Sequence, residues 1–134
     1  MIIGAALALS LVRTTIPLGA LGYPQGIALD GGAIGIRLPV HTGLKRVLLH
    51  FPITAGGSLN NGSVQVEVNG REVASAAGDR LRDATLDADV PIDGRASVVE
   101  IVLLSRFTEC ASAPAASVRV SPQGTVTFVQ DADR

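Results

Sequence analysis

Short runs in which apolar and polar side chains alternate one by one place the strongest constraint on the fold of this chain. Val64, Val66 and Val68, for example, alternate with Gln65 and Glu67. Because successive side chains of a β-strand point to opposite faces, such a run predicts a strand with one buried face. The pattern recurs in the runs 33–38, 46–51, 85–90, 118–120 and 126–128.

Turn-forming residues separate these runs. Asn69-Gly70 stands between two strand-like runs, and both residues tolerate the positive φ of a type I′ hairpin turn. Pro122-Gln123-Gly124 predicts a second turn, whereas 74–84 is interpreted as a loop or at most one helical turn. About eight to ten short strands predict an all-β fold, a two-sheet antiparallel β-sandwich of the jelly-roll type. We expect its interior to hold Val64, Val66, Val68, Val99, Ile101, Val126 and Phe128.

Composition limits the classes of partner. At 134 residues, 47% apolar and 17% charged, the chain is long and apolar enough for one folded domain with its own core. The net charge of −1 and the interspersed charges indicate no nucleic-acid partner. Cys110 is the single cysteine, so an intramolecular disulfide and a cysteine-rich zinc site are both excluded.

The N-terminal segment is uncharged from Met1 to Val12, and Arg13 ends the apolar run. About twenty apolar residues are needed to span a bilayer, so this run is too short. Three interpretations stay open: the remnant of a signal or anchor, a strand or helix that packs on the domain, or an apolar interaction arm. We therefore divide the chain into an arm (1–13), a sandwich (14–130) and a polar tail (131–134).

Motifs for catalysis and metal binding are missing from the sequence. It contains no nucleophile elbow, phosphate-binding loop or dinucleotide fingerprint. His41 and His50 lack the spacing of metal ligands, and a solvated strand face explains Asp87 and Asp89. We expect no catalytic residue, no metal and no cofactor.

The order of several motifs along the chain matches one family. They are the segments 14–22, 36–40, 47–51, 58–59, 63–70, 89–92 and 98–104, then Cys110 and 118–122, and the most specific is SVQVEVNG at 63–70. In this order the chain, from about Thr14 to Gln130, resembles the N-terminal jelly-roll domain of the bacterial cellulose synthase B-subunit family. The resemblance implies a non-catalytic, carbohydrate-binding-like domain in the periplasm, associated with the membrane. Its partners would be a cellulose synthase-like glycosyltransferase complex and a glucan chain.

Two functions follow from different residues. If the domain binds sugar, we expect Tyr23 and the polar strand residues Arg37, His50, Gln65 and Glu67 to contribute, with weak affinity because few aromatic rings are available. The alternative is a structural or assembly protein that uses its sandwich for homo-oligomeric or other protein contacts. The run 98–104 is apolar on both faces except at Glu100, which indicates that both faces are covered. The interface residues predicted on its outer face are Val98, Val102 and Leu104.

Overall fold

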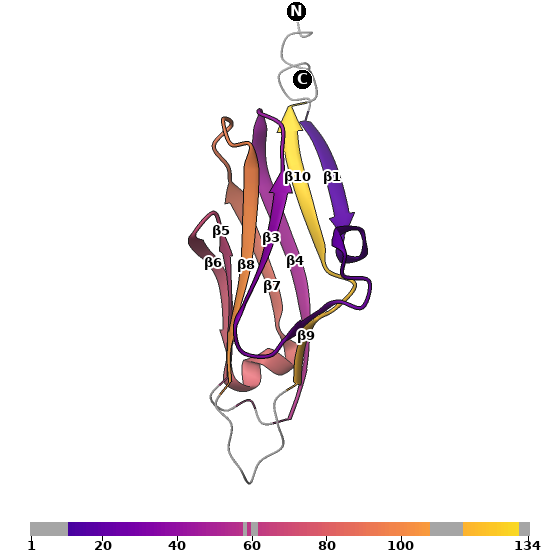
Figure 1. Cartoon of the computed structure of the whole chain (residues 1–134), viewed down its shortest axis with the longest axis vertical. Helices are drawn as coiled ribbons and strands as arrows, with labels where there is room; N and C mark the ends of the chain where they lie inside the picture. Colours follow the sequence, from indigo (N-terminus) through magenta and orange to yellow (C-terminus); the bar gives the residue numbers. More distant parts are fainter. Residues whose placement is uncertain (1–10, 58, 60–61, 108–116, 132–134) are drawn as a thin grey trace, which may run out of the picture.

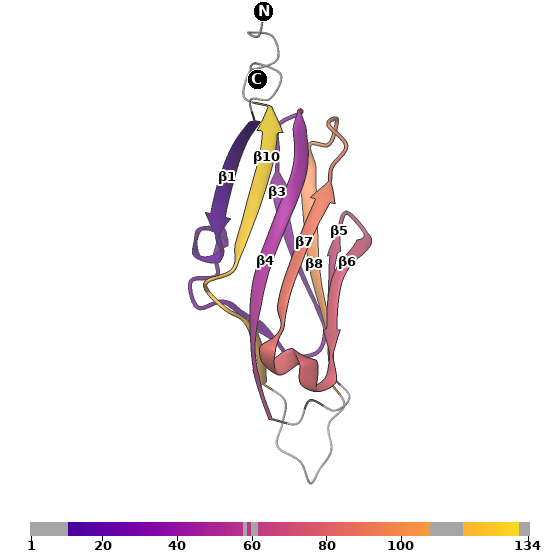
Figure 2. The same ribbon diagram turned by 180° about the vertical axis from the view of Figure 1, so that it is seen from behind.

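Two antiparallel β-sheets packed face to face form the computed structural model, which describes residues 11–57, 59, 62–107 and 117–131 (Figures 1 and 2). The predicted all-β sandwich of the jelly-roll type is confirmed. The six-stranded sheet comprises β1 (Leu11–Pro17), β10 (Thr125–Asp131), β4 (Leu44–Gly56), β9 (Ser117–Val120) and β2 (Ile27–Leu29), with β7 (Thr85–Pro91) paired to β4. The four-stranded sheet has the order β3 (Ala33–Pro39), β8 (Val98–Arg106), β5 (Ser63–Val68) and β6 (Arg71–Ala77).

The long strand β4 organises the six-stranded sheet. It pairs with β10 up to His50 and with β9 from Ile53 onward, so β9 and β10 follow each other along β4. The predicted turn at Pro122-Gln123-Gly124 lies between them, but it does not form a hairpin, because both strands pair with β4 instead of with each other. The Ser121 N–H donates to the Pro52 carbonyl (2.8 Å), which holds the start of this turn against β4.

The predicted Asn69-Gly70 hairpin is confirmed. Val68 pairs with Arg71, and the two turn residues have positive φ values of 51° and 84°. The Asn69 side chain also accepts a hydrogen bond from the Glu100 N–H (2.9 Å), which ties the hairpin to β8. The hairpin therefore fixes the register of β5 and β6 beside β8.

The core lies between the sheets and is built from aliphatic side chains. Six of the seven predicted core residues are buried: Val64, Val66, Val68, Val99, Ile101 and Val126. The seventh, Phe128, stands opposite Val47 and packs against the core but is only half-buried. It lines a small hollow with His41 and Leu44, so at this point the sandwich does not close completely over the ring.

Three boundaries differ from the prediction, one of them at Asp131, which we placed in the tail but which ends β10 and pairs with Leu11. Strand β6 continues to Ala77, and a six-residue 3₁₀ helix, η2 (Gly78–Asp83), follows where we expected at most one helical turn. Leu81 explains the helix, because its fully buried side chain anchors η2 over one end of the sandwich. Residues 11–13, which we placed in the arm, are part of β1 and pair with β10.

The remaining N-terminal residues, Cys110 and residues 132–134 of the tail lie outside the described part of the chain. A short 3₁₀ helix, η1 (Leu18–Leu21), follows β1. Neither helix in the described ranges is long and apolar enough to cross a bilayer.

Candidate functional site

The outer face of the four-stranded sheet brings the two predicted sites together. Strand register places Gln65 beside Leu104, and Glu67 beside Val102. Arg37 lies opposite Glu100 on the neighbouring strand β3. Three of the five predicted sugar-binding residues therefore share one surface with the predicted interface residues, which the sequence pattern alone did not reveal. We call this surface the β8 face; its residues are Ala33, Gly35, Arg37, Ser63, Gln65, Glu67, Val98, Glu100, Val102, Leu104 and Arg106.

The structure places the other two predicted sugar-binding residues elsewhere. His50 lies on the outer face of the six-stranded sheet, where its Nδ1 is 2.6 Å from the Asp87 carboxylate. Tyr23 follows η1 and is half-buried against the core. Neither residue joins the β8 face.

An aliphatic ridge runs along β8 in the middle of this face. Val98, Val102 and Leu104 are each half-buried, although nothing in the described chain lies over the sheet here. The neighbouring β3 contributes the small residues Ala33 and Gly35, and a Cβ built at Gly35 would meet no atom within 4 Å. The ridge is therefore flanked on one side by a shallow step that leaves room for a bound molecule.

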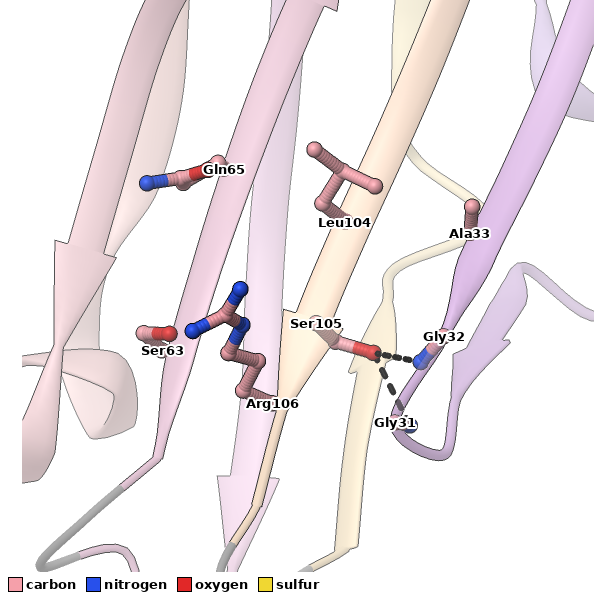
Figure 3. Close-up of a pocket in the computed structure, with 8 residues that line it drawn as sticks. All are labelled: Gly31, Gly32, Ala33, Ser63, Gln65, Leu104, Ser105 and Arg106. Atoms are coloured by element: carbon pink, nitrogen blue, oxygen red, sulfur yellow. Dashed lines mark hydrogen bonds between the residues drawn. The ribbon is translucent and has the colours of Figure 1, made fainter.

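A hollow of about 570 Å³ opens at the end of the ridge (Figure 3). Gly31, Gly32 and Ala33 form one rim, and Ser63, Gln65 and Arg106 form the opposite side, with Leu104 and Ser105 between them.

The glycine rim of the hollow is held by the buried hydroxyl of Ser105. This hydroxyl accepts hydrogen bonds from the N–H groups of Gly31 (2.9 Å) and Gly32 (3.3 Å). The Ser105 N–H in turn donates to the Gly32 carbonyl (2.9 Å). Gly31 has a φ of +91°, a conformation that suits glycine. The rim is therefore fixed in place by β8 itself.

Sequence reasoning named two residues that line this hollow, Gln65 and Leu104, and missed the others. In the sequence, Gly31-Gly32 indicates only a turn between strands, and Arg106 lies two residues beyond the apolar run 98–104. The signal for Arg106 was the alternation itself, which puts it on the same face as Leu104.

The charges and rings on the β8 face define its chemistry. Arg37 and Glu100 approach to 4.0 Å and are well exposed, so this ion pair is loose. Arg106 has no ion-pair partner among the described residues. All four aromatic residues of the chain, Tyr23, Phe51, Phe107 and Phe128, are buried or half-buried, so no exposed ring offers a stacking platform.

Two side-chain pairs link β7 to β4 on the outer face of the six-stranded sheet. Asp89 pairs with Arg46, and the Asp87 carboxylate lies 2.6 Å from Nδ1 of His50. Within the described ranges no three His, Cys, Asp or Glu side chains gather where they could hold a metal ion. The β8 face can bind a partner by hydrogen bonds, charge and apolar contact.

Comparison with known proteins identifies the fold. No family model matches the sequence, and no curated protein matches it. The chain is similar to dimeric latent PorU from Porphyromonas gingivalis, with a TM-score of 0.56 at 8% identity over 90% of this chain and 12% of that one. It is also similar to the mosquito-larvicidal Cry4Aa toxin from Bacillus thuringiensis, with a TM-score of 0.50 at 10% identity over 88% of this chain and 23% of that one.

A further solved structure is a carbohydrate-binding domain. It is the CBM36-1 domain of a multidomain xylanase from the hindgut metagenome of Trinervitermes trinervoides, with a TM-score of 0.46 at 10% identity over 87% of this chain and 96% of that one. This chain thus spans only 12% of PorU and 23% of Cry4Aa. At these identities the likeness to PorU and Cry4Aa shows a shared β-sandwich fold.

Proposed function

We propose that this chain is a non-catalytic accessory domain of a bacterial cellulose or exopolysaccharide synthesis and secretion system, and that it binds a polysaccharide chain on the β8 face. One observation supports this most directly. Arg37 on β3 and Gln65 and Glu67 on β5 project from the two strands that flank β8, onto a surface that also offers aliphatic contact. A sugar chain presents hydroxyl groups at its edges and C–H groups on its faces, and this surface matches both.

The composition of the face predicts the strength of binding. Aromatic rings give flat, rigid contact area for sugar rings, and the β8 face has none. Aliphatic side chains such as Val102 and Leu104 supply smaller and less directional contacts. Binding should therefore be weak for a single domain and depend mainly on the polar groups.

The cellular setting rests on the order of motifs along residues 14–130. That order supports a location in the periplasm, in association with the membrane, beside a membrane-bound glycosyltransferase of the cellulose synthase type. In that position a weak site suffices, because the growing chain is delivered next to it and its local concentration is high.

Affinity electrophoresis through gels that contain a soluble β-glucan such as hydroxyethyl cellulose tests this proposal. The protein should be retarded, and the double variant Gln65→Ala/Glu67→Ala should lose most of the retardation. Thr85→Ala, an exposed polar position on the six-stranded sheet, is the matched control and should migrate like the parent. Failure of the parent to be retarded by any polysaccharide, neutral or acidic, at any accessible concentration would contradict the proposal.

The aliphatic ridge favours a second candidate function, self-association without sugar binding. Val102 and Leu104 are adjacent on the outer face of β8, Val98 lies beyond Glu100 on the same face, and no described segment covers these apolar side chains. Small monomers seldom expose large apolar patches, and homo-oligomers commonly bury one shared surface. The described start of the chain, 11–13, pairs with β10 in the other sheet and does not cover the strip.

A further inference from the structure

The hollow beside Arg106 continues across the sheet as a groove. A second hollow, of about 320 Å³, lies against β5 and β6 and shares Ser63 and Gln65 with the first. The two together run from the β2–β3 turn, across β8 and β5, to β6 and η2. We call them the transverse groove; its lining residues used here are Gly32, Ala33, Ser63, Gln65, Ser75, Ala77, Arg80, Leu104 and Arg106.

The transverse groove is positively charged. Arg106 lines its first part and Arg80 its second, and both are exposed. In the described part of the chain neither guanidinium has an ion-pair partner. The nearby Asp79 is paired with Arg82 instead, at 3.5 Å. Among the described residues, no acidic side chain lines either hollow.

The position of Glu67 shows that the acidic residues of the β8 face lie away from the groove. Glu67 lies on the same face as Gln65 but two residues farther along β5, away from the groove. Gln65 is opposite Leu104, whereas Glu67 is opposite Val102. At that position and beyond, the face carries acids, among them Glu67 and Glu100. The unpaired positive charge is therefore confined to one end of the β8 face.

The shape of the groove results from small side chains at both edges of the sheet. Ala33 keeps the β3 edge low, Ser75 and Ala77 do so on β6, and a Cβ built at Gly32 would meet no atom within 4 Å. Leu104 provides an apolar surface between them. Figure 3 shows the Arg106 side chain reaching from β8 toward β5, between Ser63 and Gln65.

We propose that the transverse groove binds negatively charged sugar residues, so that the polysaccharide recognised by this domain is an acidic one. This inference rests on the proposed function and names its ligand class. A guanidinium presents a planar fork of donors that fits a carboxylate or sulfate with two parallel hydrogen bonds. The Gln65 amide and the Ser63 hydroxyl can bond to sugar hydroxyls, and Leu104 can contact the C–H face of a ring. Two arginines on one groove suit a chain that repeats its charge.

Retardation of the full chain in three gels tests the inference: alginate as a polyuronate, dextran sulfate as a sulfated glycan, and hydroxyethyl cellulose as a neutral glucan. The parent should bind an acidic glycan more tightly than the neutral one, and the preference should fall as salt is raised. Whichever acidic gel retards the protein more identifies a carboxylated or a sulfated ligand. Arg106→Gln should weaken that binding about tenfold, as expected for the loss of one charge-assisted contact. Its effect on the neutral glucan should be less than about twofold.

Two further variants separate charge from shape. Arg71→Gln removes the same charge at the β5–β6 hairpin, at the far end of the sheet, and should change binding less than twofold. Ala33→Met keeps the charge but fills the groove from its rim, and it should weaken acidic-glycan binding as much as Arg106→Gln does. All these positions are exposed, so we expect each variant to fold, and thermal melting checks this.

The outcomes distinguish this inference from the proposed function. Equal affinity for acidic and neutral glycans, or acidic-glycan binding that survives Arg106→Gln combined with Arg80→Gln, would overturn the inference and leave the proposed function standing. Equal retention of single-stranded DNA would also overturn it, because the groove would then attract any polyanion. Binding to none of the three glycans would overturn the proposed function itself.

Discussion

The outer faces of the two sheets use their charged side chains in opposite ways. On the six-stranded sheet both acids of β7 contact a side chain of β4: Asp89 pairs with Arg46, and the Asp87 carboxylate lies 2.6 Å from Nδ1 of His50. On the β8 face only one loose pair forms among the described residues, between Arg37 and Glu100 at 4.0 Å. Arg106 has no partner in the described chain, and an aliphatic ridge lies beside it.

This difference follows from strand register. On the six-stranded sheet, β7 places Asp87 directly opposite His50, and it places Asp89 opposite Leu48, within reach of Arg46. Both acids of β7 therefore find a partner on β4. On the β8 face, Arg106 lies opposite Ser63, and Glu67 lies opposite Val102. Exposed ion pairs add little stability, so the main consequence concerns binding. The acids of β7 have side-chain partners within the molecule, whereas the β8 face retains Arg106 and apolar side chains that a binding partner can contact.

The largest expected change in the free energy of unfolding comes from comparing substitutions on the buried and the exposed side of β8. Leu103 is fully buried between the sheets, whereas its neighbour Leu104 is half-buried on the β8 face. Leu103→Ala should lower the free energy of unfolding by about 2–5 kcal/mol, because it leaves a cavity in the core. Leu104→Ala should cost about 1 kcal/mol or less. Urea denaturation measures both, and equal losses would mean that the outer face of β8 is packed against something in the folded chain.

A charge on the ridge tests whether a second copy covers it. Val102→Asp changes only the outer face of β8 and should leave the protein folded. If the ridge is an interface, analytical ultracentrifugation should show an oligomeric parent and a monomeric variant. A parent that is already monomeric would remove the second candidate function.

A smaller effect is expected from changing the glycine of the β5–β6 hairpin. Gly70 has a φ of 84°, and no atom lies within 4 Å of a Cβ built there, so Gly70→Ala introduces backbone strain without a steric clash. It should lower the free energy of unfolding by about 1 kcal/mol. Thermal melting should show the loss, with polysaccharide binding unchanged. Weaker binding would mean that the hairpin positions the β8 face more directly than its register suggests.

The smallest effect is expected on the six-stranded face. His50→Ala removes one exposed partner of an ion pair and should change the free energy of unfolding by about 1 kcal/mol or less. Retardation by any glycan should be unchanged, because His50 lies on the opposite side of the molecule from Arg37 and Gln65. Reduced retardation would show that both faces bind sugar and would contradict the difference inferred between the outer faces of the two sheets.

Much of the fold was predictable because strand alternation and turn chemistry are local. The runs around Val66 and Ile101, and the Asn69-Gly70 turn, needed only the neighbouring residues. The helix η2 was missed because its main stabilising contact is tertiary, the burial of Leu81 over the end of the sandwich. The extent of β1 was missed because its first residues depend on pairing with β10, which lies at the other end of the chain.

The candidate site was less predictable, since it depends on which strands become neighbours. Arg37, Gln65 and Glu67 were chosen as outward-facing polar residues, and the pairing of β3 and β5 with β8 brought them together. His50 followed the same local rule, but β4 belongs to the other sheet. Arg106 and Ser63 form a groove only because β5 pairs with β8 in this register.

Backbone amide chemical shifts, measured by ¹H–¹⁵N correlation NMR during titration with alginate or a soluble β-glucan, test the central claim most directly. The claim predicts that the amides that shift are those of β8, β5 and the β2–β3 turn, with Arg106, Gln65 and Gly32 among the largest changes. The amides of β4 and β7 around His50 and Asp87 should not move. Shifts that cluster on the six-stranded face, or no shifts at saturating concentrations of both ligands, would contradict the assignment of the β8 face as the binding surface.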